Sequence, residues 1–234
     1  IQNILKYCGD KMVYEATTHG SGWAGIERKA RLRLRELYEK IYEKDVGQTS
    51  ASLEPGIAGT AKPENLYGLF DWPMGRKCVE LLEDHYVVPK YIAQDFLQRV
   101  PPNVPLMYRE SWPSLFIGRN NSFGGLHIDV FGSAFWQYVI DGKKEWHITS
   151  PLADFPAGYS FFEPNEVESN VVHYHGVVNP GEFIYIPGNC PHQVKNIGNT
   201  VAIAGNVVST TEMNSMRKEI SGSDRKYYME LQNT

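Results

Sequence analysis

Short apolar runs rich in β-branched and aromatic residues alternate with turn residues between about 112 and 208. Alternation of this kind predicts an antiparallel sandwich or barrel. The Asp141-Gly142 pair within "IDGKKEW" is typical of a tight turn and predicts a hairpin at that point. The runs are "SLFIGR", "GLHIDVFG", "FWQYVIDG", "KKEWHITS", "EFIYIPG", "HQVKNIG" and "VAIAGNVVS".

Residues before about 100 follow a different pattern, which reads mostly as helix. In "AGIERKARLRLRELYEKIYEKD", Ala30, Leu34, Leu37 and Ile41 recur at helical spacing. A shorter helix is expected after Pro89, and 47–64, rich in Gly, Ser, Ala and Pro, is expected to be a mobile loop. We therefore divide the chain into an N-terminal helical or mixed segment (1–111), a β core (112–208) and a C-terminal helical segment (209–234).

Composition narrows the classes of protein. The chain has 234 residues, 42% of them hydrophobic, and a net charge of -4. It can bury a sizeable core, and it offers no basic surface for nucleic acid and no apolar run of about 18 residues for a membrane. Cys8, Cys78 and Cys190 are few and far apart, which favours a reducing compartment, the nucleus or the cytoplasm. The sequence begins at Ile1, as expected of a fragment or processed form.

The motif "GGLHIDVFG" carries the first candidate chemistry. On a strand, His127 and Asp129 would project from one face, with Leu126 and Ile128 on the other. The best third partner is His192, which follows a Pro-Gly turn in "YIPGNCPHQVKN". Two histidines and one carboxylate form the facial triad of non-haem Fe(II) oxygenases, which leaves positions open for a cosubstrate and O₂. We call His127, Asp129 and His192 the triad.

A buried histidine paired with a nearby aspartate is also a common structural arrangement, so the triad needs support from another residue. Lys144 lies at the start of the next predicted strand, from which it could reach the same cavity. A buried lysine requires a partner, and a dicarboxylate cosubstrate would supply one. Strand alternation places either Lys143 or Lys144 inside, and the sequence leaves open which.

Other ligand sets compete with the triad. His173 and His175 form an i, i+2 pair that a cupin-type site would join to His192. That pattern requires a glutamate four residues after the second histidine, where this chain has Asn179. We therefore expect the pair to lie at the pocket mouth or to face solvent. Cys190 would suit zinc only with a second cysteine nearby, so we assign it to packing.

The ordered segments "GGLHID…GSAFWQYVIDGKKEW…PGEFIYIPGNCPHQVKN" resemble the Jumonji-C (JmjC) family of Fe(II)/2-oxoglutarate oxygenases. Upstream, "LYGLFD…LLEDHYVVPKYIAQDF" is similar to the branch that includes the bifunctional arginine demethylase and lysyl hydroxylase. The resemblance covers about residues 66–208. It implies a mainly β protein with flanking helices around a double-stranded β-helix, or jelly-roll, core.

The resemblance also implies residue roles. The triad would hold Fe(II), and Lys144 would bind the distal carboxylate of 2-oxoglutarate. Asn206 matches a position that lines the same pocket, and Gln137 stands where the branch has an asparagine, so both are expected to contribute to cofactor binding. Gly124 and Ala204, like Gln137, depart from polar residues that help to hold the cosubstrate in relatives.

The expected function is that of a 2-oxoglutarate-dependent dioxygenase that uses O₂ to hydroxylate or N-demethylate a Lys or Arg side chain of a protein or peptide. Alternatives are a JmjC module that binds a partner without turnover and an oxygenase acting on RNA or a small molecule. Glu163, Glu166 and Glu168 in "FFEPNEVES" are expected near the pocket mouth, where they could attract a cationic peptide. The sequence leaves the oligomeric state open.

Overall fold

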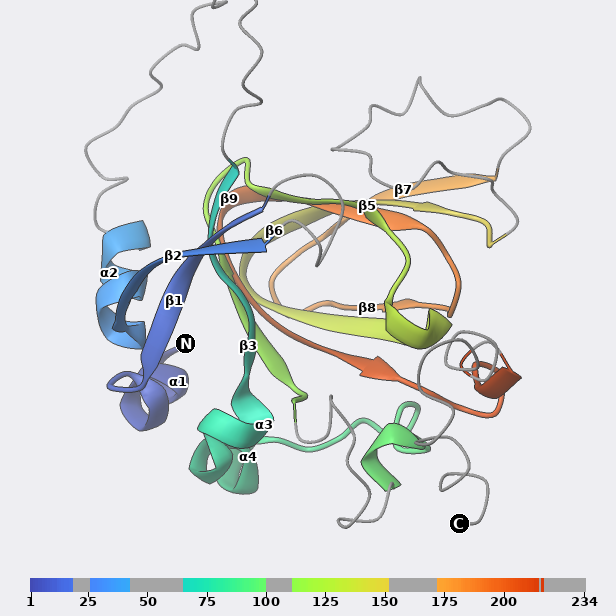
Figure 1. Ribbon diagram of the computed structural model, residues 1–234, viewed down its shortest axis with the longest axis horizontal. Helices are drawn as coiled ribbons and strands as arrows, with labels where there is room; N and C mark the ends of the chain where they lie inside the picture. The colour runs from blue at the N-terminus through green and yellow to red at the C-terminus, as the bar shows by residue number, and fades with distance from the viewer. Residues whose placement is uncertain (19–25, 43–64, 100–110, 152–171, 215, 217–234) are drawn as a thin grey trace, which may run out of the picture.

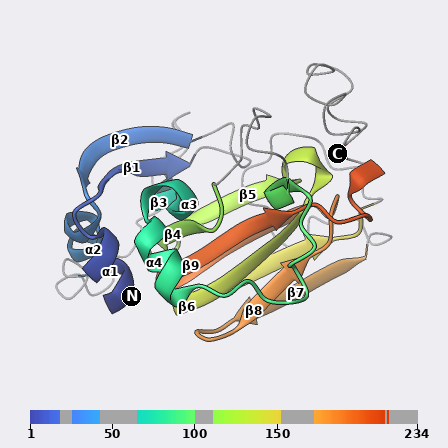
Figure 2. The same ribbon diagram turned by 90° about the horizontal axis from the view of Figure 1, so that it is seen from below.

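The computed structural model describes residues 1–18, 26–42, 65–99, 111–151, 172–214 and 216. Within them, nine strands form one antiparallel, strongly curved sheet, with short helices at one end (Figures 1 and 2). The strands are β1 (Met12–Thr18), β2 (Ile26–Arg33), β3 (Asn65–Pro73), β4 (Ser114–Gly118), β5 (Phe123–His127), β6 (Ala134–Thr149), β7 (His173–Val178), β8 (Phe183–Ile186) and β9 (His192–Val207). The helices are α1 (Gln2–Cys8), α2 (Leu34–Tyr42), α3 (Met74–Lys77) and α4 (Val79–His85), with 3₁₀ turns η3 (Leu97–Arg99) and η4 (Val130–Gly132).

Two long strands, β6 and β9, organise the core. Residues 143–148 of β6 pair with 192–197 of β9, and residues 134–141 pair with 201–207. Around the first pairing the strand order is β5-β9-β6-β7, and around the second it is β4-β9-β6-β8. Two four-stranded antiparallel layers that share their central strands make the jelly roll that the sequence predicted.

The predicted hairpin at Asp141-Gly142 is wrong, because β6 continues through it. The β6–β9 register shifts on both sides of Asp141, so the glycine sits in a bulge between the two layers. Gly142 has a left-handed φ of 69°, and a Cβ there would lie 2.2 Å from the Asn199 carbonyl oxygen. The turn signal therefore marks the bend in a single strand.

The mostly helical interpretation of the N-terminal segment is also wrong. It contributes β1, β2 and β3, and β3 pairs with β4, so these strands extend the sheet of the core. The long predicted helix divides in two: Ala30 lies on β2, whereas Leu34, Leu37 and Ile41 are fully buried on α2. Pairing with β1 satisfies the backbone of β2, which outweighs local helix propensity. The shorter helix predicted after Pro89 is also wrong: in the described residues from Pro89 to Arg99 the helical structure is the 3₁₀ turn η3 alone.

The main apolar cluster packs α1, α2 and α4 against β3 and β4. Cys8 and Cys78 form a disulfide at this cluster, with Cα atoms 5.8 Å apart. The expectation of unpaired cysteines is therefore wrong for these two, and it no longer supports a reducing compartment; Cys190 is free and buried, as expected of a packing residue. No helix among the described residues is long and apolar enough to cross a bilayer. The predicted loop 47–64 lies outside the described residues, as does most of the C-terminal segment.

Candidate metal centre and its pocket

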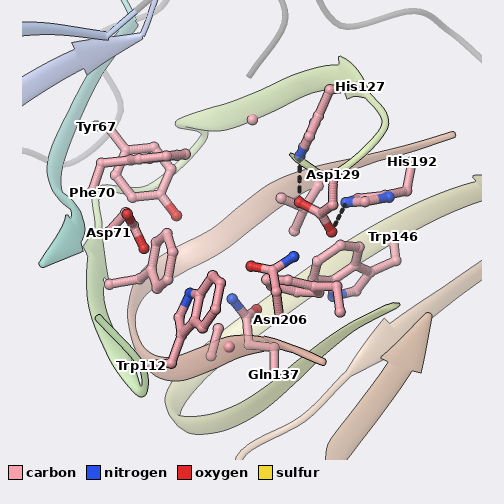
Figure 3. Close-up of a pocket in the computed structure, with 16 residues that line it drawn as sticks. Tyr67, Phe70, Asp71, Trp112, His127, Asp129, Gln137, Trp146, His192 and Asn206 are labelled. Carbon is pink, nitrogen blue, oxygen red and sulfur yellow. Dashed lines mark ion pairs between the residues drawn. The ribbon is translucent and has the colours of Figure 1, made fainter. Parts of the chain in front are cut away.

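The triad assembles where β5 meets β9. His127 is the last residue of β5 and pairs directly with His192, the first residue of β9. Asp129 lies two residues beyond β5, not on the strand as expected, and Ile128 between them is 48% exposed rather than packed. Asp129 Oδ1 lies 3.8 Å from His127 Nε2, and Asp129 Oδ2 lies 3.7 Å from His192 Nε2 (Figure 3).

Backbone carbonyl groups fix both imidazoles in the orientation that a metal requires. His127 Nδ1 donates to the Gly125 carbonyl at 2.7 Å, and His192 Nδ1 donates to the Cys190 carbonyl at 2.9 Å. The two Nε2 atoms are thus left with free lone pairs, the usual arrangement for ligating histidines. Burial, together with nearby His127, lowers the pKa of His192 to about 4, so this ring is neutral near pH 7.

The pocket also has buried polar atoms without hydrogen-bond partners. Asp129 Oδ2, Gln137 Oε1 and Trp146 Nε1 all belong to side chains that line it. Buried polar groups are normally satisfied, so such atoms in one pocket indicate a polar occupant. The donor set of two imidazoles and one carboxylate, with ligand atoms within 4.8 Å of one another, fits Fe(II) with open coordination positions.

Lys144 lies on β6 in the same half of the barrel and is completely buried, but it is not among the residues that line the pocket; Lys143 is exposed. Lys144 Nζ donates to Tyr67 Oη at 3.2 Å and to Asn196 Oδ1 at 2.8 Å. Tyr67 itself lines the pocket. The sequence analysis did not identify Tyr67 or Asn196 as site residues. The one indication of Tyr67 was its place in the "LYGLFD" segment, which resembles the family.

The other two predicted cofactor residues, Gln137 and Asn206, do line the pocket. Gln137 and Asn206 are both buried there, and Asn206 Nδ2 donates to Ser133 Oγ at 2.9 Å. Gly124 and Ala204, the positions that depart from polar residues in relatives, line it too. The substitutions relative to the family therefore fall in the pocket wall.

Asp71 is a pocket residue that the sequence analysis missed. It lies on β3 with a left-handed φ of 50°, and its carboxylate faces the pocket among aromatic side chains (Figure 3). Burial, assisted by the negative charge of Asp129, raises its pKa to about 7, while a hydrogen bond from Ser114 opposes the shift. The available signal was an acidic residue at the end of the "LYGLFD" motif.

The rival cupin-type set does not form. His173 and His175 lie on β7 beside His147, and the side chain of His175 is 49% exposed, close to the expectation that the pair faces solvent. The acidic residues Glu163, Glu166 and Glu168 lie outside the described residues.

Comparison with known proteins agrees with this geometry. Residues 159–207 match the family model described as "JmjC domain, hydroxylase". The chain is 30% identical over 167 residues to the Drosophila melanogaster 2-oxoglutarate and iron-dependent oxygenase JMJD4 homolog, and 24% identical over 174 residues to the Homo sapiens JMJD4. It is 26% identical over 212 residues to the Arabidopsis thaliana arginine-specific demethylase JMJ22.

These matches cover 68%, 68% and 82% of this chain but 37%, 40% and 41% of the three relatives, so it spans about two fifths of their length. The family model includes His192 and Asn206, and the fold supplies the other triad residues in ligating positions. Motif order, jelly-roll topology and these relatives together show that the chain belongs to the JmjC family.

Proposed function

We propose that this chain is the oxygenase domain of an Fe(II)- and 2-oxoglutarate-dependent enzyme that oxidises a basic side chain of a protein. The observation that carries the proposal is the convergence of the triad's three ligand atoms at one end of a pocket, with a buried lysine behind its wall. When bound, the iron supplies the chemistry that couples decarboxylation of 2-oxoglutarate by O₂, giving succinate and CO₂, to insertion of one oxygen atom into a substrate C–H bond.

Residues of the chain would bind the metal, bind the cosubstrate and exclude water. The triad would hold Fe(II), and Lys144 would pair with the distal carboxylate of 2-oxoglutarate beside Tyr67, whose hydroxyl group it contacts. A dicarboxylate suits this position because it compensates a buried ammonium group, whose hydrogen-bond partners among the described residues are the neutral oxygens of Tyr67 and Asn196. Gln137 and Asn206 would contribute hydrogen bonds to the cosubstrate, and the aromatic walls would exclude water from the reacting atoms.

Asp71 supports a basic substrate. A cation that enters the pocket would favour the ionised form of this carboxylate and gain a short-range ion pair away from bulk water. The relatives' names include an arginine-specific demethylase and, more distantly, a lysine-specific demethylase, JMJ21 of Arabidopsis thaliana. Hydroxylation of carbon and oxidation of an N-methyl group both begin at a C–H bond, so one site serves either outcome.

For the location of the protein in the cell, our prediction stays the nucleus or the cytoplasm.

A panel of peptides tests the proposal. The purified chain with Fe(II), 2-oxoglutarate and O₂ is incubated with Lys- and Arg-containing peptides, methylated and unmethylated, and the products are analysed by mass spectrometry. We expect a gain of one oxygen, or loss of a methyl group, on a basic side chain, with none for Asp129→Ala. Turnover on RNA or a small molecule but on no peptide would contradict the substrate class. Iron binding without succinate release on any substrate would instead favour a JmjC module that binds a partner without turnover.

A further inference from the structure

A second group of potential ligands lies on the other face of β6. Trp146 lines the iron pocket, so strand alternation directs Glu145 and His147 away from it. The antiparallel register sets His175 of β7 directly opposite His147, and places His173 opposite the next outward residue of β6. Two strands therefore bring three histidines and a glutamate together on a face of the sheet that the triad does not use.

The contacts within this group suit a single ion. His175 Nε2 lies 2.9 Å from Glu145 Oε1, and His147 Nε2 lies 3.5 Å from the same oxygen. One ligand atom from each of the three residues lies within 4.8 Å of the others. Ligands at about 2.0–2.1 Å in a tetrahedral zinc site are separated by about 3.4 Å, so the distances of Glu145 Oε1 from the two imidazole nitrogens, 2.9 Å and 3.5 Å, are close to those of such a site.

His173 fixes the orientation of the central ring. His147 Nδ1 lies 3.1 Å from His173 Nε2, and the planes of the two rings are nearly parallel, with an interplanar angle of 8°. If His147 Nδ1 carries the proton and donates to His173, its Nε2 lone pair points toward Glu145 and His175. A ligating histidine whose other nitrogen is held by a hydrogen bond is the common arrangement in metal sites.

We propose that Glu145, His147 and His175 form a second metal site, of the Zn²⁺ class, on the face of the sheet opposite the triad. Two imidazoles and one carboxylate are a zinc donor set, and the partly exposed His175 leaves the fourth position to water. The ion would join β6 to β7, which is the last strand in the order of the sheet and pairs with β6. His173 acts as a positioning residue through its bond to His147.

Zinc binding in a chain without the triad tests the site. In the full chain carrying His127→Ala and Asp129→Ala, we expect one Zn²⁺ per chain by atomic emission after dialysis, with micromolar or tighter affinity by calorimetric titration. Adding His175→Ala should abolish this zinc binding. The loss of affinity should exceed the about 10–100-fold loss that follows removal of a residue that only orients a ligand. His85→Ala, which removes an exposed histidine elsewhere, should leave zinc binding unchanged.

His173→Ala in the same background should weaken zinc binding by about 10–100-fold while keeping the stoichiometry attainable at high zinc. His175 is exposed, so circular dichroism should show an unchanged fold in His175→Ala. Glu145→Gln provides a second variant that alters only the carboxylate. No zinc in the triad-free chain, or zinc that persists undiminished in both His175→Ala and Glu145→Gln, would overturn the proposal.

Discussion

The triad and the Glu145–His147–His175 group use the same kinds of ligand on opposite faces of neighbouring strand segments, but the chain holds them differently. Asp129 and His192 are buried and His127 is partly buried, and backbone carbonyls of a strand and a turn fix the two histidines. In the second group, side chains orient one another, and His175 is half exposed. Ligands held by backbone beside a pocket suit a reaction in that pocket, whereas ligands that side chains orient on two paired strands suit an ion that links the strands.

The largest expected effect separates the two groups by metal. Asp129→Ala leaves the triad with two protein ligands, so we expect Fe(II) stoichiometry to fall from one to near zero while zinc binding at the second group persists. Glu145→Gln should do the reverse. Inductively coupled plasma measurements of both metals on both variants check this. Loss of iron in Glu145→Gln with retention in Asp129→Ala would reverse our assignment of the two sites.

Lys144→Ala should raise the KM for 2-oxoglutarate by two to three decades, because removing one partner of a buried ion pair costs about 3–5 kcal/mol. Iron binding should change far less, and Lys143→Ala, on the exposed side of the same strand, should change the KM less than about twofold. Thermal melting checks that the variant is folded. A large KM effect at Lys143 with none at Lys144 would show that the cosubstrate lies on the outer face.

Asp71→Asn should change how stability depends on pH. Folded Asp71 keeps its proton up to about pH 7, whereas the unfolded residue keeps it only to about 3.8. Folding therefore takes up a proton within this window, and the stability of the iron-free chain falls as pH rises from about 4 to about 7. The variant lacks this loss of stability, which amounts to about 4 kcal/mol between the two pH values.

Denaturant unfolding of both chains at a series of pH values measures the difference. Asparagine tolerates the left-handed backbone at position 71, so the substitution adds little strain. Identical pH profiles for the two chains would mean that Asp71 is already ionised in the folded protein. With basic peptides, Asp71→Asn should raise the peptide KM more than it lowers kcat.

The smallest expected effect concerns Gln137, whose Oε1 lies unpartnered in the pocket. Gln137→Ala should raise the KM for 2-oxoglutarate by about 3–10-fold, since one hydrogen bond contributes about 0.5–1.5 kcal/mol. Tyr138→Ala, at the next and more exposed position of β6, is the matched control and should leave the KM unchanged. An effect confined to Tyr138 would contradict the pocket assignment.

Strand periodicity predicted an antiparallel sandwich or barrel, and a short motif predicted the His127–Asp129 pair, because both patterns are local; the jelly-roll topology came from the family resemblance. The same locality explains the errors. The Asp141-Gly142 signal is identical in a hairpin and in a bulge, and only pairing with β9 distinguishes them. The 70-residue separation of Cys8 and Cys78 concealed their contact. The spacing of His173 and His175 indicated a possible ligand pair. The proximity of His147 to them follows from the β6–β7 register, which the local sequence does not reveal.

Succinate release tests the central claim most directly. With Fe(II), 2-oxoglutarate, O₂ and an accepted basic peptide, the wild-type chain and Glu145→Gln should both produce succinate in step with peptide oxidation, whereas Asp129→Ala should produce none above the protein-free rate. Equal succinate from wild type and Asp129→Ala, or loss of succinate in Glu145→Gln alone, would contradict the assignment of catalysis to the His127–Asp129–His192 pocket.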